Sequence, residues 1–289
     1  MPVATDAPLA PLTTLRLGGP AKRLMPVESE AELVDAVREV DASGEPLLVL
    51  AGGSNLVLPD AGWPGVVVHV QTGGVAGEDG VLEVQAGESW DDLVAATVAD
   101  GLAGFECLSG IPGSVGATPI QNVGAYGQEV SETVRWVRVF DRRTRRTQTM
   151  TAAECGFDYR TSVFKYHDRR VVLSVTFRLR ESTMSGPLGY AELARKLDIE
   201  PGGTAPLADV RAAVLQLRRG KGMVIDPNDP DSVSAGSFFT NPILDTAPPG
   251  APAWPEPGGR VKTSAAWLIE QAGFHKGYGN GRAGISAKH

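Results

Sequence analysis

The chain has 289 residues, of which 42% are hydrophobic and 21% are charged, and this composition is typical of a globular protein that folds in water. Its length suffices for two or three domains. The formal net charge of −7 argues against nucleic acid as the main partner. No apolar stretch approaches the roughly 18 residues that a membrane span needs, so we expect no membrane partner.

The remaining bulk features concern the compartment and metal binding. The first twelve residues, MPVATDAPLAPL, lack the basic and apolar segments of a signal peptide, so we expect a cytoplasmic protein. The two cysteines, Cys107 and Cys155, lack the spacing of metal ligands and are expected to be buried thiols. The four histidines are scattered along the chain, and we assign none of them a catalytic role. No metal site is expected.

The first part of the chain, residues 15–70, is predicted to form a strand, a helix, a strand, a loop and a further strand. The helix lies in SEAELVDAVREVDASG, where Ser29 and Glu32 have the spacing of a capping box. The strand in LLVL runs directly into the glycines of AGGSN. Ligands of α/β proteins tend to bind at the carboxyl ends of such strands.

Strands dominate residues 80–181, which we interpret as an α+β domain. SWDDLVAATVADGL is predicted to be a helix with Ser89 at its N-cap. TVRWVRVFD and RTQTM are predicted to form a hairpin, and RRVVLSVTFRLR a long strand. The basic run between the two hairpin strands, Arg142, Arg143, Arg145 and Arg146, is expected to be a solvated turn.

Helical periodicity returns after residue 187, in YAELARKL and in PLADVRAAVLQLRRGKG. SAGSFFTNPIL is predicted to be a glycine turn that leads into an aromatic strand. DTAPPGAPAWPEPGGR is expected to be a surface loop, because periodic sequence resumes after it in TSAAWLIEQAGF. These patterns divide the chain into three predicted domains, residues 1–70, 71–182 and 183–289.

Two glycine-rich segments carry the strongest chemical signal, LAGGSN and IPGSVGATPIQNVGAYG. Glycines allow main-chain N–H groups to converge on an anion such as a phosphate. The segments lack both the lysine of a P-loop and the GxGxxG pattern of a dinucleotide fold. Isoleucine and valine residues are interleaved with the donors, which suits a flat, partly apolar cofactor that carries a pyrophosphate.

These two segments, followed by FDYRTSVFK, resemble the corresponding motifs of the UDP-N-acetylenolpyruvoylglucosamine reductases (the MurB family, type I). The resemblance continues through GSFFTNP and AAWLIEQAGF and covers the chain from about residue 15. It implies an α+β fold with a two-part FAD-binding module of the vanillyl-alcohol-oxidase type, followed by a C-terminal α+β substrate-binding domain. A monomer is expected.

The resemblance also implies the reaction. NADPH would reduce FAD, and the flavoprotein would then reduce UDP-N-acetyl-3-O-(1-carboxyvinyl)-glucosamine to UDP-N-acetylmuramate for peptidoglycan biosynthesis. The two glycine-rich loops would wrap the FAD, with an arginine at the end of a helix lying close to the flavin. The implied FAD-binding residues are Gly52, Gly53, Ser54, Asn55, Ile111, Pro112, Gly113, Ser114, Gly116, Ala117, Gln121, Asn122, Gly124, Ala125, Tyr126 and Arg218.

Two residues match catalytic positions of the family, Arg160 and Ser237. The resemblance implies that Arg160 stabilises the enolate that develops after hydride transfer, and that Ser237 supplies the proton that completes the reaction. Lys221 is a candidate helper of that proton transfer. The implied substrate-binding residues are Tyr159, Tyr190, Lys221, Asn241 and Lys262, of which Tyr190 belongs to a mobile segment and Lys262 is expected near the uridine.

One departure from the family keeps alternatives open. The family's third catalytic residue, a glutamate in a C-terminal Pro-Glu motif, has no counterpart here, and we do not transfer its role to Glu256. We expect either that the natural chain continues past His289 or that this is a relic that binds FAD or the nucleotide sugar without turnover. A flavin oxidase on a similar FAD module is the other alternative.

Overall fold

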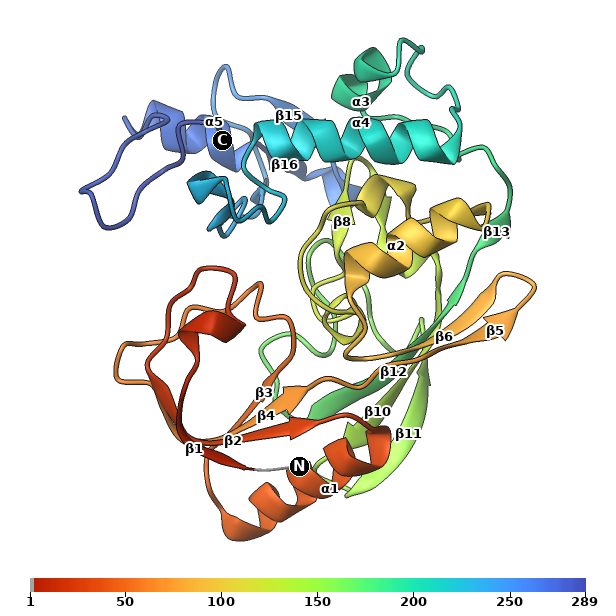
Figure 1. Ribbon diagram of the computed structural model, residues 1–289. Helices are drawn as coiled ribbons and strands as arrows, with labels where there is room; N and C mark the ends of the chain where they lie inside the picture. The colour runs from red at the N-terminus through yellow and green to blue at the C-terminus, as the bar shows by residue number, and fades with distance from the viewer. Residues whose placement is uncertain (1–2) are drawn as a thin grey trace. The chain divides into compact units, whose positions relative to one another are not determined.

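The computed structural model describes residues 3–289 (Figure 1). The chain divides into two compact units, one that ends at Arg219 and one that runs from Gly220 to His289. The boundary between these compact units, after Arg219, lies later in the chain than the predicted domain boundary after residue 182. The three domains therefore remain a prediction.

The first sheet of the first unit has the strand order β1-β2-β4-β3, in which β2, β4 and β3 run parallel and β1 is antiparallel. Helix α1 connects β2 to β3, as the sequence predicts. The strand β1 was missed, because four of its five residues are exposed and its sequence has no apolar alternation. The elements are β1 (Ala4–Pro8), β2 (Pro20–Val27), α1 (Glu30–Ser43), β3 (Leu47–Leu50) and β4 (Trp63–Val70).

The start of α1 follows the predicted capping pattern with one change. The Ser29 hydroxyl accepts a hydrogen bond from the Glu32 N–H at 3.2 Å. The Glu32 carboxylate, however, accepts from the N–H of Glu28 at 2.8 Å, one residue before the position that a capping box would use. The helix ends at Gly44, whose φ of 71° closes the last turn.

The second sheet of this unit is antiparallel and has the order β11-β10-β12-β6-β5. The predicted hairpin is confirmed as β10 and β11, joined by the basic turn. One arginine of that turn is not simply solvated, because Arg142 pairs with Asp41 at 2.6 Å and with Asp168 at 3.0 Å. The strands are β5 (Val75–Glu78), β6 (Val81–Gln85), β10 (Val134–Asp141), β11 (Arg146–Thr151) and β12 (Arg170–Arg178).

Short helices and strands complete the first unit. Ser89 stands at the N-cap of α2 as predicted, but its side chain makes no capping hydrogen bond. The remaining elements are α2 (Trp90–Ala99), β7 (Leu102–Ala103), β8 (Gly124–Ala125), β9 (Gln128–Glu129), β13 (Arg180–Glu181), α3 (Ala191–Lys196) and α4 (Leu207–Gly220), together with 3-10 turns at Ala10–Leu12, Glu106–Leu108, Val115–Ala117 and Val130–Glu132.

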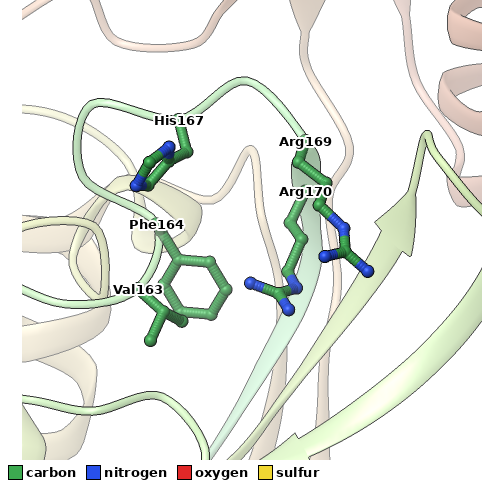
Figure 2. Close-up of a pocket in the computed structure, with 5 residues that line it drawn as sticks. All are labelled: Val163, Phe164, His167, Arg169 and Arg170. Atoms are coloured by element: carbon green, nitrogen blue, oxygen red, sulfur yellow. The ribbon is translucent and has the colours of Figure 1, made fainter.

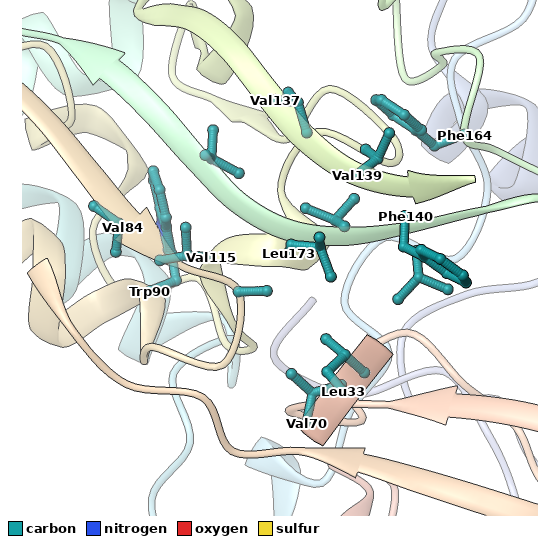
Figure 3. Close-up of a cluster of buried hydrophobic side chains, with 14 of the residues drawn as sticks. Leu33, Val70, Val84, Trp90, Val115, Val137, Val139, Phe140, Phe164 and Leu173 are labelled. Carbon is teal, nitrogen blue, oxygen red and sulfur yellow. The ribbon is translucent and has the colours of Figure 1, made fainter. Parts of the chain in front are cut away.

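One hydrophobic core joins the two sheets of the first unit (Figure 3). Leu33 of α1 and Val70 of β4 pack in the same cluster as Val139 of β10 and Leu173 of β12. The ring of Trp90 lies 4.8 Å from that of Phe105. Close packing of this kind makes the core a rigid support for the loops that leave it.

The two cysteines are confirmed as buried thiols. Burial raises the pKa of both Cys107 and Cys155 to about 12. Both thiols therefore stay protonated near neutral pH and are poor nucleophiles.

The second unit contains a small sheet of order β14-β16-β15 and the helix α5. The predicted aromatic strand is wrong: Phe238 and Phe239 are 73% and 61% exposed and lie outside any strand, and pairing begins only at Ile243. The expected proline-rich loop contains a short strand that pairs with β16. The elements are β14 (Ile243–Leu244), β15 (Ala253–Pro255), β16 (Val261–Thr263) and α5 (Ala265–Gln271), with 3-10 turns at Pro230–Ser232 and Pro257–Gly259.

Within residues 3–289, every helix is too short or too polar to cross a bilayer.

Candidate functional site

The two glycine-rich segments, about 60 residues apart in sequence, touch each other through their backbones. A Cβ on Gly52 would lie only 2.7 Å from the Gly113 Cα, and one on Gly113 would lie 2.6 Å from the Ser54 Oγ. The φ of Gly113 is +113°, a conformation that also favours glycine. Asn55 donates to the Gln121 side chain at 3.4 Å and links the loops again. The fold therefore brings together the loops that the sequence singled out.

A cavity of about 320 Å³ opens where these loops meet. The Ser114 hydroxyl is buried and has no hydrogen-bond partner among the described residues. Several main-chain N–H groups beside it also donate to no acceptor within residues 3–289, namely those of Gly52, Gly53, Ser54, Asn55, Gly113 and Ser114. Of these residues, Gly52, Gly113 and Ser114 line the cavity. Donors without partners are the groups that a pyrophosphate requires, so the residues present fit FAD.

Six residues that line this cavity are absent from the predicted site residues, namely Ala51, His69, Val70, Gln71, Gly87 and Ser89. His69 pairs with Leu50 at the end of β3, so β4 delivers His69 and Gln71 to the same sheet edge as the glycines of AGGSN. The rule that parallel strands present their carboxyl ends at one edge could have found them. Burial lowers the pKa of His69, so its ring is held neutral near pH 7.

Part of the second loop serves the fold instead of facing a ligand. The N–H of Gly116 donates to the Ala86 carbonyl at 2.9 Å, and a Cβ there would lie 2.5 Å from the Ala86 Cβ. Gly116 is therefore a packing glycine whose N–H is unavailable to a phosphate. Val115 is fully buried in the core, so it cannot face a cofactor ring. The other predicted FAD residues of this loop are half-buried, namely Ile111, Pro112, Ala117, Gln121, Gly124 and Ala125.

Arg160 lies in a tight turn beside the same loop. Its backbone is left-handed, with φ of 54°, and its guanidinium lies 5.1 Å from the centre of the Tyr159 ring. One terminal nitrogen, Nη2, donates to the Gly124 carbonyl at 2.7 Å. The other, Nη1, donates to Glu129 at 3.1 Å and to the Asn122 carbonyl at 3.3 Å. The Nε–H and the second hydrogen of Nη2 have no partner among residues 3–289.

The side chain of Asn122, one of the implied FAD-binding residues, is turned toward the protein. Asn122 is 1% exposed and left-handed, with φ of 46°. Its amide nitrogen donates to Glu129 at 2.7 Å and to the Asp158 carbonyl at 3.1 Å, and its amide oxygen accepts from the N–H of Ser131 at 3.1 Å. Its side-chain amide is therefore occupied by the protein.

Two tyrosines and an arginine form a second group near the loop. The rings of Tyr126 and Tyr190 meet edge to face at 5.3 Å. Burial raises the pKa of Tyr126 to about 12. Arg218, in the last turn of α4, is only 6% exposed, and this burial lowers its pKa although the charges of Tyr126 and Asp91 oppose the shift. Tyr126 is thus a neighbour of both Tyr190 and Arg218.

A carboxylate fixes α4 to the start of the second loop. Asp91 accepts from Arg211 of α4 through both of its oxygens, at 2.6 and 3.0 Å. The same carboxylate accepts from the N–H of Gly110 at 2.6 Å. A bidentate arginine–carboxylate pair has a defined geometry, so it fixes the position of α4, which carries Arg218, relative to the start of the loop.

Among the predicted residues of the second unit, Ser237 is exposed, and Lys221, Asn241 and Lys262 are half-buried. The Ser237 hydroxyl lies 3.5 Å from Nε2 of His289, at the outer limit of a hydrogen bond. Asn241 accepts from the N–H of Ala265 at 2.9 Å and so helps to start α5. Lys262 pairs with Glu256 at 2.5 Å, and Lys221 is half-buried just after α4.

None of these residues lines another cavity of about 300 Å³ (Figure 2). Val163, Phe164, His167, Arg169 and Arg170 line it, and none of them is a predicted site residue. Asp141 neutralises Arg169 at 2.6 Å. In the part of the chain that the structure describes, no group of three or more His, Cys, Asp or Glu side chains is arranged to bind a metal ion.

Replacing Gly52 with alanine is expected to weaken FAD binding. The added Cβ meets the backbone of Gly113, which cannot rotate away. Overpacking of this kind costs about 1–3 kcal/mol, which corresponds to a Kd for FAD that is raised roughly 5- to 150-fold. Gly186→Ala is the matched control, because no atom of the described residues lies within 4 Å of its Cβ position. FAD titration of the apoprotein measures the effect, and an unchanged Kd would contradict it.

Two parts of the chain match known protein families. Residues 21–149 match the FAD binding domain family, and residues 228–289 match the family described as UDP-N-acetylenolpyruvoylglucosamine reductase, C-terminal domain. The UDP-N-acetylenolpyruvoylglucosamine reductase of Thermobifida fusca is 56% identical over 99% of this chain and 86% of its own length. That of Streptomyces avermitilis is also 56% identical, over 98% of this chain and 83% of its own.

A solved structure supports the fold. The crystal structure of UDP-N-acetylenolpyruvylglucosamine reductase from Thermus caldophilus is 28% identical, with a TM-score of 0.64, and the match covers 100% of this chain and 85% of that one. The expected fold of an FAD-binding module with a C-terminal domain is confirmed, and the flavin oxidase and the non-catalytic relic are not favoured. The chain belongs to the UDP-N-acetylenolpyruvoylglucosamine reductase family.

Proposed function

We propose that this protein uses NADPH and bound FAD to reduce UDP-N-acetyl-3-O-(1-carboxyvinyl)-glucosamine to UDP-N-acetylmuramate, a step of peptidoglycan biosynthesis. Its relatives bear the name of this reductase. The structural observation that carries the proposal is the contact of the Gly52 and Gly113 loops around a cavity with unpartnered donors. We place the enzyme in the cytoplasm as a monomer.

In this proposal the two loops hold the cofactor. The N–H groups of Gly52, Gly113 and Ser114, with the Ser114 hydroxyl, would bind the pyrophosphate, and buried Arg218 would hold the flavin end. When bound, FAD would supply to the enol-ether double bond of the substrate a hydride that comes from NADPH. The buried core behind the loops keeps these donors in place before the ligand arrives, so little ordering is needed on binding.

Arg160 is the proposed electrostatic catalyst. When a hydride adds to the terminal carbon of the enol ether, negative charge develops on the neighbouring carbon and its carboxylate. The Nε–H and the remaining Nη2 hydrogen of Arg160, which have no partner within residues 3–289, are available to that oxyanion. An interaction that strengthens as charge develops lowers the barrier more than one that binds only the substrate.

Ser237 is the proposed proton donor to the carbon beside the carboxylate. A serine hydroxyl is a weak acid, so it needs a neighbouring group to replace its proton, and Lys221 is our candidate. We also propose that Tyr159, Tyr190, Lys221 and Asn241 bind the substrate, with Lys262 toward the uridine. The amide nitrogen of Asn241 donates to no acceptor within residues 3–289 and is available for this role, while its oxygen accepts from the N–H of Ala265 at the start of α5.

Spectroscopy of the purified protein tests the proposal. Flavin absorption bands should be present, NADPH should bleach them without oxygen, and the enolpyruvyl sugar should restore them with formation of UDP-N-acetylmuramate, detected by mass. Absence of flavin would contradict the cofactor assignment. Bleaching that oxygen reverses rapidly and the sugar does not would favour an oxidase instead.

A further inference from the structure

We infer that Glu129 is a positioning residue that fixes the guanidinium of Arg160, with Asn122 as its support. This inference rests on the proposed role of Arg160 in catalysis. Glu129 lies in β9, directly opposite Gly124 of β8. It therefore belongs to the hairpin that closes the second glycine-rich loop.

Both oxygens of the Glu129 carboxylate are engaged. Oε1 accepts from Nη1 of Arg160 at 3.1 Å, and Oε2 accepts from the amide nitrogen of Asn122 at 2.7 Å. Asn122 cannot turn away, because its amide also binds the Asp158 carbonyl and the N–H of Ser131. The carboxylate is thus held from behind by a buried amide, and its other oxygen faces the arginine.

The backbone of Arg160 is fixed as well. Asp158 and Thr161 exchange main-chain hydrogen bonds across the turn, and Lys165 donates to the Arg160 carbonyl at 2.7 Å. Gly124 leaves the space that the guanidinium fills, since a Cβ there would lie 2.6 Å from Nη1 of Arg160. With both ends of the side chain fixed, the N–H groups without partners point in one constant direction, which is the condition for preorganised electrostatic catalysis.

The partial exposure of the Arg160–Glu129 ion pair makes it possible to distinguish a positioning role of Glu129 from a role in folding stability. The side chains of Arg160 and Glu129 are 26% and 32% exposed. Pairs screened by solvent to this degree add little to folding stability. A large effect of changing Glu129 on one chemical step, with a small effect on unfolding, would therefore come from the geometry of Arg160.

Glu129→Gln is the test variant, because it keeps the size of the side chain but removes its charge. One carboxylate oxygen becomes an amide nitrogen, which cannot accept from Asn122 or Arg160, and the other becomes a neutral oxygen, which accepts more weakly. The return of flavin absorbance on adding the enolpyruvyl sugar should be about 10- to 100-fold slower, since small misplacements of a catalytic group cost this much. The rate of bleaching by NADPH and the FAD content should stay close to those of the wild type, and the Tm should fall only slightly, because the hydrogen bond from Asn122 is weakened. Binding of the enolpyruvyl sugar to the oxidised protein, measured by titration, should weaken.

Glu154→Gln is the matched control, because within residues 3–289 the carboxylate of Glu154 accepts hydrogen bonds only from Thr151, in an exposed turn. The decisive comparison is the double variant with Arg160→Ala, in which Glu129→Gln should cause no further loss. The inference would be overturned if the rate losses of the two single variants multiplied in the double variant. It would also be overturned if Glu129→Gln reacted with the sugar as fast as the wild type. If Glu129→Gln does not retain FAD, Glu129→Asp replaces it in both comparisons. Failure of the wild type to respond to the sugar would instead reject the proposed function.

Discussion

Replacing Arg160 with alanine is expected to slow the return of flavin absorbance on adding the enolpyruvyl sugar about 100- to 1,000-fold, the usual cost of removing one preorganised oxyanion donor. Bleaching by NADPH should continue at close to the wild-type rate, because no enolate forms in that half-reaction. Stopped-flow absorbance without oxygen resolves the two half-reactions.

Two further variants sharpen the result for Arg160. Arg160→Lys keeps the charge but loses the forked contacts to Glu129, Asn122 and Gly124, so its rate should lie between those of the wild type and the alanine variant. Arg143→Ala removes an exposed arginine of the hairpin turn and should change neither half-reaction. An Arg160→Ala variant that lost only the NADPH step would show that Arg160 is misassigned.

Replacing Ser237 with alanine is expected to remove the proton donor. The return of flavin absorbance with the sugar should slow about 100- to 10,000-fold, the usual contribution of general acid catalysis. The exposed position of Ser237 means that the change leaves no cavity, so the Tm should not move. Bleaching by NADPH serves as the internal reference in the same experiment.

Thr240→Ala is the control for Ser237, because it removes an exposed hydroxyl from the same segment. A Ser237→Ala variant that responds to the sugar at the wild-type rate would reject the proton-donor role. Equal losses in Ser237→Ala and Thr240→Ala would indicate a general disturbance of the exposed segment around Phe238 and Phe239.

The helices α1, α2 and α4 and the strands β3, β4, β10 and β12 could be predicted from the sequence, because each carries its own hydrophobic pattern. The strand β11 is mostly exposed and was predicted only as the second strand of the hairpin that begins with β10. The strands β1 and β15 could not, because their residues are mostly exposed and only pairing with β2 and β16 makes them strands. Phe238 and Phe239 show the opposite error, since a high strand propensity produces no strand without a partner.

Within the candidate site, the motifs alone identified the two glycine-rich loops, the FAD and the family, because glycines and donors follow one another along the chain there. Only the tertiary structure decided which donors are free and which serve the fold. The sequence places Asn122 among the ligand-binding residues, yet its amide nitrogen donates to the carbonyl of Asp158, 36 residues away. The link from Asn122 through Glu129 to Arg160 likewise joins separate segments, and local spacing contains no information about such contacts.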